Sequence, residues 1–200
     1  KANAISENLG IGIDANAAGM IVLTVRENVI RNNVDSVVND GVVTGDGIEL
    51  RTLPTGTIHL TATGNFIEGN DGRGIDLLNF GTMQMKIGDP MLPMDTGRNH
   101  IVGNFHEGIY IVNTAAYDPD NGCVQPQDVA STVDLLDCGP WGASPDLMLH
   151  LDTSTIEDNG LGTGFSGTGL VIRAGTVGGG GGVFSRDPSG DFARQGGMGE

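Results

Sequence analysis

Positive charge is scarce in this sequence, and long apolar runs are absent. Ten lysines and arginines stand against 25 aspartates and glutamates, so the formal net charge is −15. An acidic surface repels phosphate groups, which argues against binding to nucleic acid or to an anionic membrane surface. No apolar stretch approaches the ~20 residues of a transmembrane helix, so we expect no membrane span.

Aromatic side chains are also few, with six Phe, two Tyr and one Trp among 200 residues. This is a small number for a protein that binds sugars by stacking. Tyr117 and Trp141 are the exceptions, because both lie in one long insertion and form a candidate binding loop for extracellular glycan. The simpler interpretation is that they pin their own loop onto the body of the protein.

The sequence has only two cysteines, Cys123 and Cys138, and both fall in that same insertion. A disulfide between them would close a loop of about 15 residues and contribute on the order of 3 kcal/mol to stability. The alternative is a pair of free thiols in a reducing cytosol. We expect the disulfide, and with it an oxidising, extracellular or cell-surface location.

Glycine, in contrast, is abundant at 34 of 200 residues, and much of it belongs to a repeated phrase. The phrase is plainest at residues 65–77, where it reads Asn-x-Ile-x-x-Asn, a short Gly-rich step, and Gly-Ile-x-Leu. Its first half recurs at residues 3–8, 28–33, 99–104 and, with Ser154 in place of the first Asn, 154–159. A constant phrase at variable spacing indicates a repeat protein with insertions at its corners.

Between the phrases, apolar residues occupy every second position, a pattern typical of β-strands. They are Ile21, Leu23, Val25; Ile58, Leu60, Ala62; Met83, Met85, Ile87; and Leu147, Leu149, Leu151. Three short strands and three corners make one coil of a solenoid. We therefore predict an all-β solenoid of about five coils across residues 1–175, with an insertion at about 114–146 and a Gly-rich tail or linker at 176–200.

Stacking such coils places equivalent residues above one another. The isoleucines of the phrase would then fill a dry interior. The second asparagines would form a ladder at one corner, since their amides both donate and accept hydrogen bonds and tolerate left-handed backbone angles. The predicted ladder is Asn8, Asn33, Asn70, Asn104 and Asn159.

The Asn-x-Ile-x-x-Asn…Gly-Ile phrase resembles the repeat of the right-handed parallel β-helix family, to which the pectate lyases belong. The resemblance covers about Asn3 to Ile172 and implies a right-handed parallel β-helix. That family includes pectin-active enzymes, phage tailspikes, adhesins and surface-coat proteins. The resemblance therefore implies the fold and leaves the function to be argued from individual residues.

One column of acidic residues is the sharpest candidate for chemistry. Asp14, Glu49 and Asp76 each follow a Gly-Ile pair, so they would lie on adjacent coils ~4.8 Å apart and face outward. Such a column can be a solvated face, a calcium site or a catalytic pair of the glycosidase kind, and we favour the solvated face. Asp118 and Asp120 resemble the start of a calcium loop that lacks its later acidic ligand.

Enzyme motifs of the resembling family are missing. Pectin hydrolases of this fold carry Asn-Thr-Asp, Asp-Asp, Gly-His-Gly and Arg-x-Lys, and none of these occurs here; Asn113-Thr114, for example, leads into Ala115. The Asp-Pro-His motif of alginate epimerases is also missing. The four histidines, His59, His100, His106 and His150, are scattered and are interpreted as surface residues. We therefore assign no catalytic residue.

These patterns favour a structural or adhesive segment of an extracellular or cell-surface protein or assembly. The alternatives are a polysaccharide lyase or hydrolase and a glycan-binding module. A solenoid that stops in mid-stack exposes unpaired backbone groups and an apolar interior. We therefore expect further polypeptide or another protein subunit at its ends.

Overall fold

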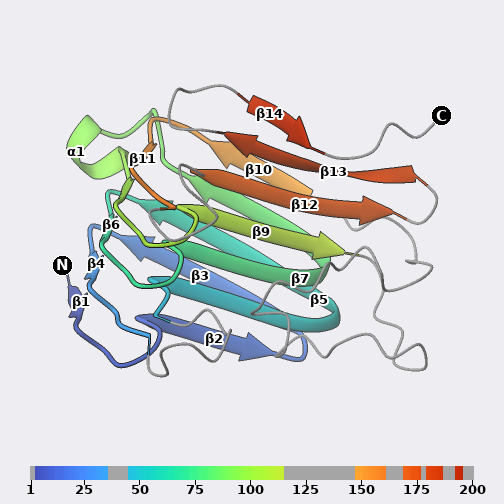
Figure 1. Cartoon of the computed structure of the whole chain (residues 1–200), viewed down its shortest axis with the longest axis horizontal. Helices are drawn as coiled ribbons and strands as arrows, with labels where there is room; N and C mark the ends of the chain where they lie inside the picture. Colours follow the sequence, from blue (N-terminus) through green and yellow to red (C-terminus); the bar gives the residue numbers. More distant parts are fainter. Residues whose placement is uncertain are drawn as a thin grey trace.

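A computed structural model describes residues 3–35, 45–114, 147–160, 169–176, 179–186 and 192–195, and most of these residues lie in strands (Figure 1). The insertion proper, with Tyr117, Cys123, Cys138 and Trp141, lies outside the described residues, so its predicted bounds stay a prediction. The described part contains one short helix, α1 (Met94–Gly97). It contains no helix of the length and apolarity that crossing a membrane requires.

Five three-residue strands, one from each copy of the phrase, form a parallel sheet. They are β1 (Ala4–Ser6), β4 (Val29–Arg31), β6 (Phe66–Glu68), β8 (His100–Val102) and β11 (Thr155–Glu157), in that spatial order. The phrase isoleucines stand opposite one another in every pair, from Ile5 to Ile156. Each copy of the phrase thus forms one coil, and equivalent residues of the phrase occupy equivalent positions in successive coils.

The longer strands form a second, larger sheet that wraps around the interior. It contains β2 (Ile13–Ala17), β3 (Met20–Arg26), β5 (Ile48–Thr63), β7 (Ile75–Ile87), β9 (Ile109–Thr114), β10 (Leu147–Leu151) and β12 (Leu170–Thr176). The first half of β5 pairs with β2 and its second half with β3. On its other side β5 pairs with β7, and the register of that pairing shifts between Arg51 and Thr57. β7 divides in the same way between β9 and β10.

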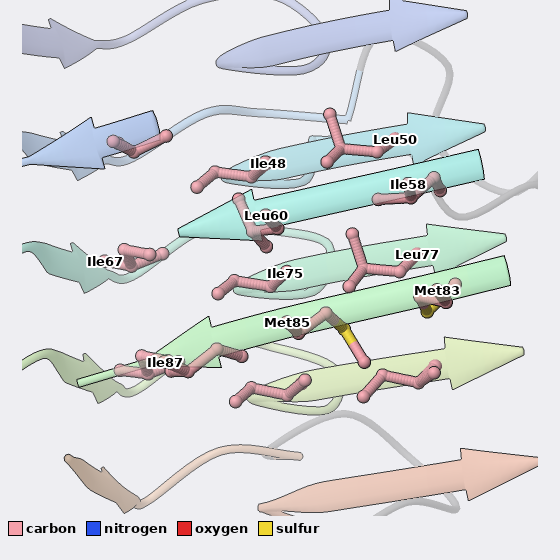
Figure 2. Packing of buried hydrophobic residues seen from close by; sticks show 14 of the residues in the cluster. Ile48, Leu50, Ile58, Leu60, Ile67, Ile75, Leu77, Met83, Met85 and Ile87 are labelled. Atoms are coloured by element: carbon pink, nitrogen blue, oxygen red, sulfur yellow. The ribbon is translucent and has the colours of Figure 1, made fainter. Parts of the chain in front are cut away.

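The core lies between these strands and runs the length of the stack. Figure 2 shows Ile48 and Leu50 on the first half of β5, facing Ile58 and Leu60 on the second half, which runs back in the opposite direction. All four side chains are at most 2% exposed. Burying one such side chain contributes roughly 1.5–3 kcal/mol, so a continuous apolar column holds the coils together. The predicted all-β parallel solenoid of about five coils is confirmed.

The two ends of the stack of coils differ. At one end, the strands of the first coil, β1, β2 and β3, each pair with a strand of the second coil and with no other described strand. At the other end, β10 and β11 also pair on one side only among the described strands. There β13 (Gly179–Arg186) pairs antiparallel with β12, and β14 (Phe192–Gln195) pairs antiparallel with β13 (Figure 1). Both antiparallel strands fall within residues 176–200, the segment that the sequence predicts to be a tail or linker without repeats.

Candidate functional site

The acidic column follows the predicted register. Asp14 stands opposite Glu49, Glu49 opposite Asp76, and Asp76 opposite Tyr110, on the outward side of β2, β5, β7 and β9. The expectation that this column faces solvent holds for Asp14 alone. Glu49 is only 3% exposed and Asp76 only 5%, so two of the three carboxylates are buried although they point away from the apolar core.

A second column of charged residues, which the sequence analysis did not identify, lies at the corner beside the first. Asp46, Arg73 and Glu107 each precede the glycine of a Gly-Ile pair on successive coils. All three side chains are buried. The order negative, positive, negative places Arg73 between two acids. The spacing of this column is as regular as that of the acidic column, but its residue type changes from coil to coil, so the spacing was the one signal that could have identified it.

Arg73 links the two columns. Its Nε donates a hydrogen bond to Glu107 Oε2 at 2.9 Å, and its Nη1 donates one to Asp76 Oδ2 at 3.1 Å. The guanidinium carbon lies 4.0 Å from the centre of the Tyr110 ring, a cation–π contact. Burial lowers the pKa of Arg73, but the charges of Asp76 and Glu107 outweigh this effect and raise it, so the guanidinium stays charged.

Asp46, Glu49 and Asp76 together form what we name the acid cluster. One side-chain oxygen from each can be chosen so that all three lie within 4.8 Å of one another. Arg51 provides a second cation, with its Nε 2.6 Å from Glu49 Oε1, although the N–H is not aligned for a hydrogen bond. The backbone N–H of Arg73 donates to Asp46 Oδ1.

The acid cluster strongly perturbs its own protonation. Burial raises the pKa of Asp46 well above its usual range, and the charge of Asp76 raises it further. The pKa of Glu49 rises to about 7, mainly because of burial, while the charge of Arg51 opposes the rise and that of Asp76 adds to it. Carboxylates packed this closely without enough positive charge bind protons or a cation.

The asparagines of the phrase make two ladders. Along the predicted one, each Nδ2 donates to Oδ1 of the next coil, at 2.8, 2.8, 2.7 and 2.8 Å from Asn8 to Asn159. The first asparagines, Asn3, Asn28, Asn65 and Asn99, form a parallel ladder that ends on Ser154. Both ladders satisfy buried backbone and side-chain groups, so their role is structural.

The remaining candidates are dispersed. Asp118 and Asp120 lie outside the described residues, as do Tyr117, Trp141 and both cysteines. The disulfide therefore stays a prediction, to be tested by mass spectrometry of unreduced peptides.

The four histidines lie in different surroundings. His150 is exposed, His59 is half-buried, and His100 stacks on Phe66 with ring centres 4.7 Å apart. Burial, followed by the charge of Arg73, lowers the pKa of His106.

The acid cluster can hold charge, but a substrate has restricted access to it. A carboxyl group that acts as a general acid or base must come within hydrogen-bond reach of a substrate. The three members of the acid cluster are at most 5% exposed. Comparison of the chain with protein-family models, with curated proteins and with solved structures found no match.

Proposed function

We propose that this chain is a structural or adhesive segment of an extracellular or cell-surface protein or assembly, and that the open edge of its first coil docks onto another coil of the same repeat. The observation that carries the proposal is the one-sided pairing of β1, β2 and β3. An unpaired strand edge presents a row of N–H and C=O groups that bind a further strand.

Side-chain burial supports the same docking edge. Ile5 and Ile13 of the first coil are only partly buried, whereas their counterparts in the second coil, Ile30 and Ile48, are 0% exposed. An incoming coil would remove this remaining apolar surface from water, at roughly 25 cal/mol for each Å². The first coil therefore offers backbone pairing and apolar contact on a single surface.

The ladder that begins at Asn8 indicates which kind of coil would dock onto the first coil. In each later coil, the Oδ1 of the ladder asparagine accepts a hydrogen bond from the Nδ2 of the preceding coil. Asn8 is exposed, and within the described part of the chain its Oδ1 accepts from no donor. An asparagine in the same position of an incoming coil would supply that donor, which favours a coil with this repeat over an unrelated strand.

The burial of the acid cluster weighs against the rival proposal of a polysaccharide lyase or hydrolase. The extracellular location rests on the expected disulfide between Cys123 and Cys138. A glycan-binding module would depend on Tyr117 and Trp141. Two alkylated free thiols would contradict the location without affecting the proposed docking edge.

Light scattering of the purified chain over a range of concentrations tests the docking. We expect association that strengthens with concentration. Ala15→Lys places a charge on the partly buried, inward side of β2 and should give monomers. Asn16→Lys, on the exposed outward side of the same strand, is the matched control and should still associate. A monodisperse wild-type monomer at every concentration would contradict the proposal.

A further inference from the structure

The buried charges around the acid cluster do not balance. Four carboxylates, those of Asp46, Glu49, Asp76 and Glu107, meet two guanidinium groups, those of Arg51 and Arg73. With all four carboxylates ionised, four negative and two positive charges leave a net charge of −2. Unbalanced charge is costly in a buried site, because little water is present to solvate it. One divalent cation would neutralise this excess.

The hydrogen-bond pattern leaves oxygens for such a cation. Each member of the acid cluster contacts an arginine through one named oxygen: Oδ1 of Asp46, Oε1 of Glu49 and Oδ2 of Asp76. The second oxygen of Asp46, Oδ2, is buried and has no hydrogen-bond partner in the described structure, and Asp46 itself is 0% exposed. A buried carboxylate oxygen without a donor is satisfied either by a cation or by a proton shared with a neighbouring carboxylate.

We propose that the acid cluster of Asp46, Glu49 and Asp76 binds one calcium ion. The ligand atoms are all carboxylate oxygens, the type preferred by hard cations and not by metals that favour nitrogen or sulfur. Calcium–oxygen distances of ~2.3–2.6 Å place opposite ligands up to ~5 Å apart. The chosen oxygens of the acid cluster all lie within 4.8 Å of one another, inside that span.

The ion would tie together two adjacent coils. Asp46 precedes β5 and Glu49 lies at its start, both in the second coil, and Asp76 in β7 of the third coil stands opposite Glu49. The set differs from the predicted one, since Asp46 takes the place of the exposed Asp14. The site does not depend on whether the coils assemble.

Calorimetric titration of the full chain with CaCl₂, after removal of metals with EGTA, tests the proposal. We expect one ion per chain. At a hundredfold excess over the dissociation constant, the melting temperature should rise by about 5–10 °C relative to EGTA. Asp46→Asn keeps an oxygen that can accept from Arg73 but removes one negative ligand, and should weaken calcium binding at least ~10-fold.

Two controls isolate the site. Asp14→Asn changes the exposed neighbour in the same column, and a double Asp118→Asn, Asp120→Asn variant removes the other calcium candidate. Both should bind as the wild type does. If Asp46→Asn does not fold, as judged by circular dichroism in EGTA, Glu49→Gln replaces it. The absence of calcium binding by the wild type, or unchanged affinity in the cluster variant, would overturn the proposal and assign the excess charge to bound protons.

Discussion

At the scale of single residues, backbone conformation is strained one position before each ladder asparagine. Glu7, Asn32, Gly69, Gly103 and Asp158 adopt left-handed φ angles of 61°, 53°, 61°, 65° and 53°. The ladder asparagines themselves do not, so their role is hydrogen bonding and not tolerance of left-handed angles. A β-carbon in this conformation costs roughly 1–2 kcal/mol, whereas glycine adopts it without that cost.

Gly103→Ala measures this strain directly. A β-carbon at Gly103 would meet no atom within 4 Å, so only the backbone conformation is affected. We expect a loss of about 1–2 kcal/mol in the free energy of unfolding, measured by urea denaturation. The reverse change, Glu27→Gly at an exposed residue with φ of 54°, should gain about 0.5–1 kcal/mol. Equal effects of the same sign from both substitutions would contradict this interpretation.

His106 should make stability depend on pH. Burial and the charge of Arg73 lower its pKa, so the folded state binds the proton more weakly than the unfolded state. Its contribution is therefore fully present above the unfolded pKa of ~6.5 and is lost as the pH falls below that value. Compared with His106→Gln, the wild type should lose stability between pH 7 and pH 5.5.

The quantity to measure is the difference in free energy of unfolding between the wild type and His106→Gln at each pH. Glu49, whose pKa is about 7, titrates in the same range with the opposite sign, because its protonated form is the one favoured by burial. It does so in both proteins and cancels in the difference. If this difference is the same at every pH, as measured by urea denaturation, His106 does not contribute to the pH dependence of stability.

The sequence predicts residues well where their type repeats. The ladder asparagines and the register of Asp14, Glu49 and Asp76 follow from a constant spacing within the phrase. Asp46 and Arg73 were missed because their column changes residue type at every coil, so no repeat marks it. Their importance depends on burial and on charges from adjacent coils, which single-sequence patterns do not report.

At the scale of the structural element, the ladder joins coils that lie far apart in the sequence. Asn70 accepts hydrogen bonds through Oδ1 from the backbone N–H and Nδ2 of Asn33, at 3.2 and 2.8 Å, and donates to Asn104 at 2.7 Å. Each of these groups is buried. Truncating one asparagine thus leaves partners on two neighbouring coils unsatisfied.

Asn70→Ala should therefore cost about 3–5 kcal/mol, since each unsatisfied buried group costs roughly 1–3 kcal/mol. Asn8→Ala is the control, because Asn8 is exposed and water can replace its hydrogen bonds. That variant should lose less than about 1 kcal/mol. Urea denaturation of both variants checks the comparison. Similar losses at the two positions would show that burial of the ladder contributes little.

Strand boundaries were harder to predict than strand existence. The sequence predicts a strand at residues 58–62, but the structure continues it from residue 48 as β5, because the chain bends at the corner without ending its hydrogen bonding. β13 includes a run of four glycines that has no alternating pattern. Its pairing depends on the available edge of β12, a feature of the folded structure rather than of local sequence.

At the scale of the whole molecule, stability should vary along the stack. Each coil of a solenoid contacts only its neighbours, so a coil with one neighbour is held less firmly than a coil with two. The first coil has partly buried Ile5, Ile13 and Leu23, whereas Ile75 and Leu77 in β7 of the third coil are 0% exposed. At the other end β13 covers the edge of β12, and of the strands of the last coil only β10 and β11 pair on one side in the described structure. The first coil, in which all three strands pair on one side, should therefore be the first to separate.

Amide hydrogen exchange can resolve this gradient strand by strand. In dilute solution, the amides of β2 and β3 should exchange through local opening at least tenfold faster than those at Ile75–Leu78 of β7, which pair on both sides with β5 and β9. At concentrations where the chain associates, docking of another coil should slow exchange in β2 and β3 and leave β7 unchanged. The Ala15→Lys variant should show the gradient without its concentration dependence. Uniform protection across the stack in dilute solution would mean that the first coil is held as firmly as the interior coils, and would remove the physical reason for a docking partner there.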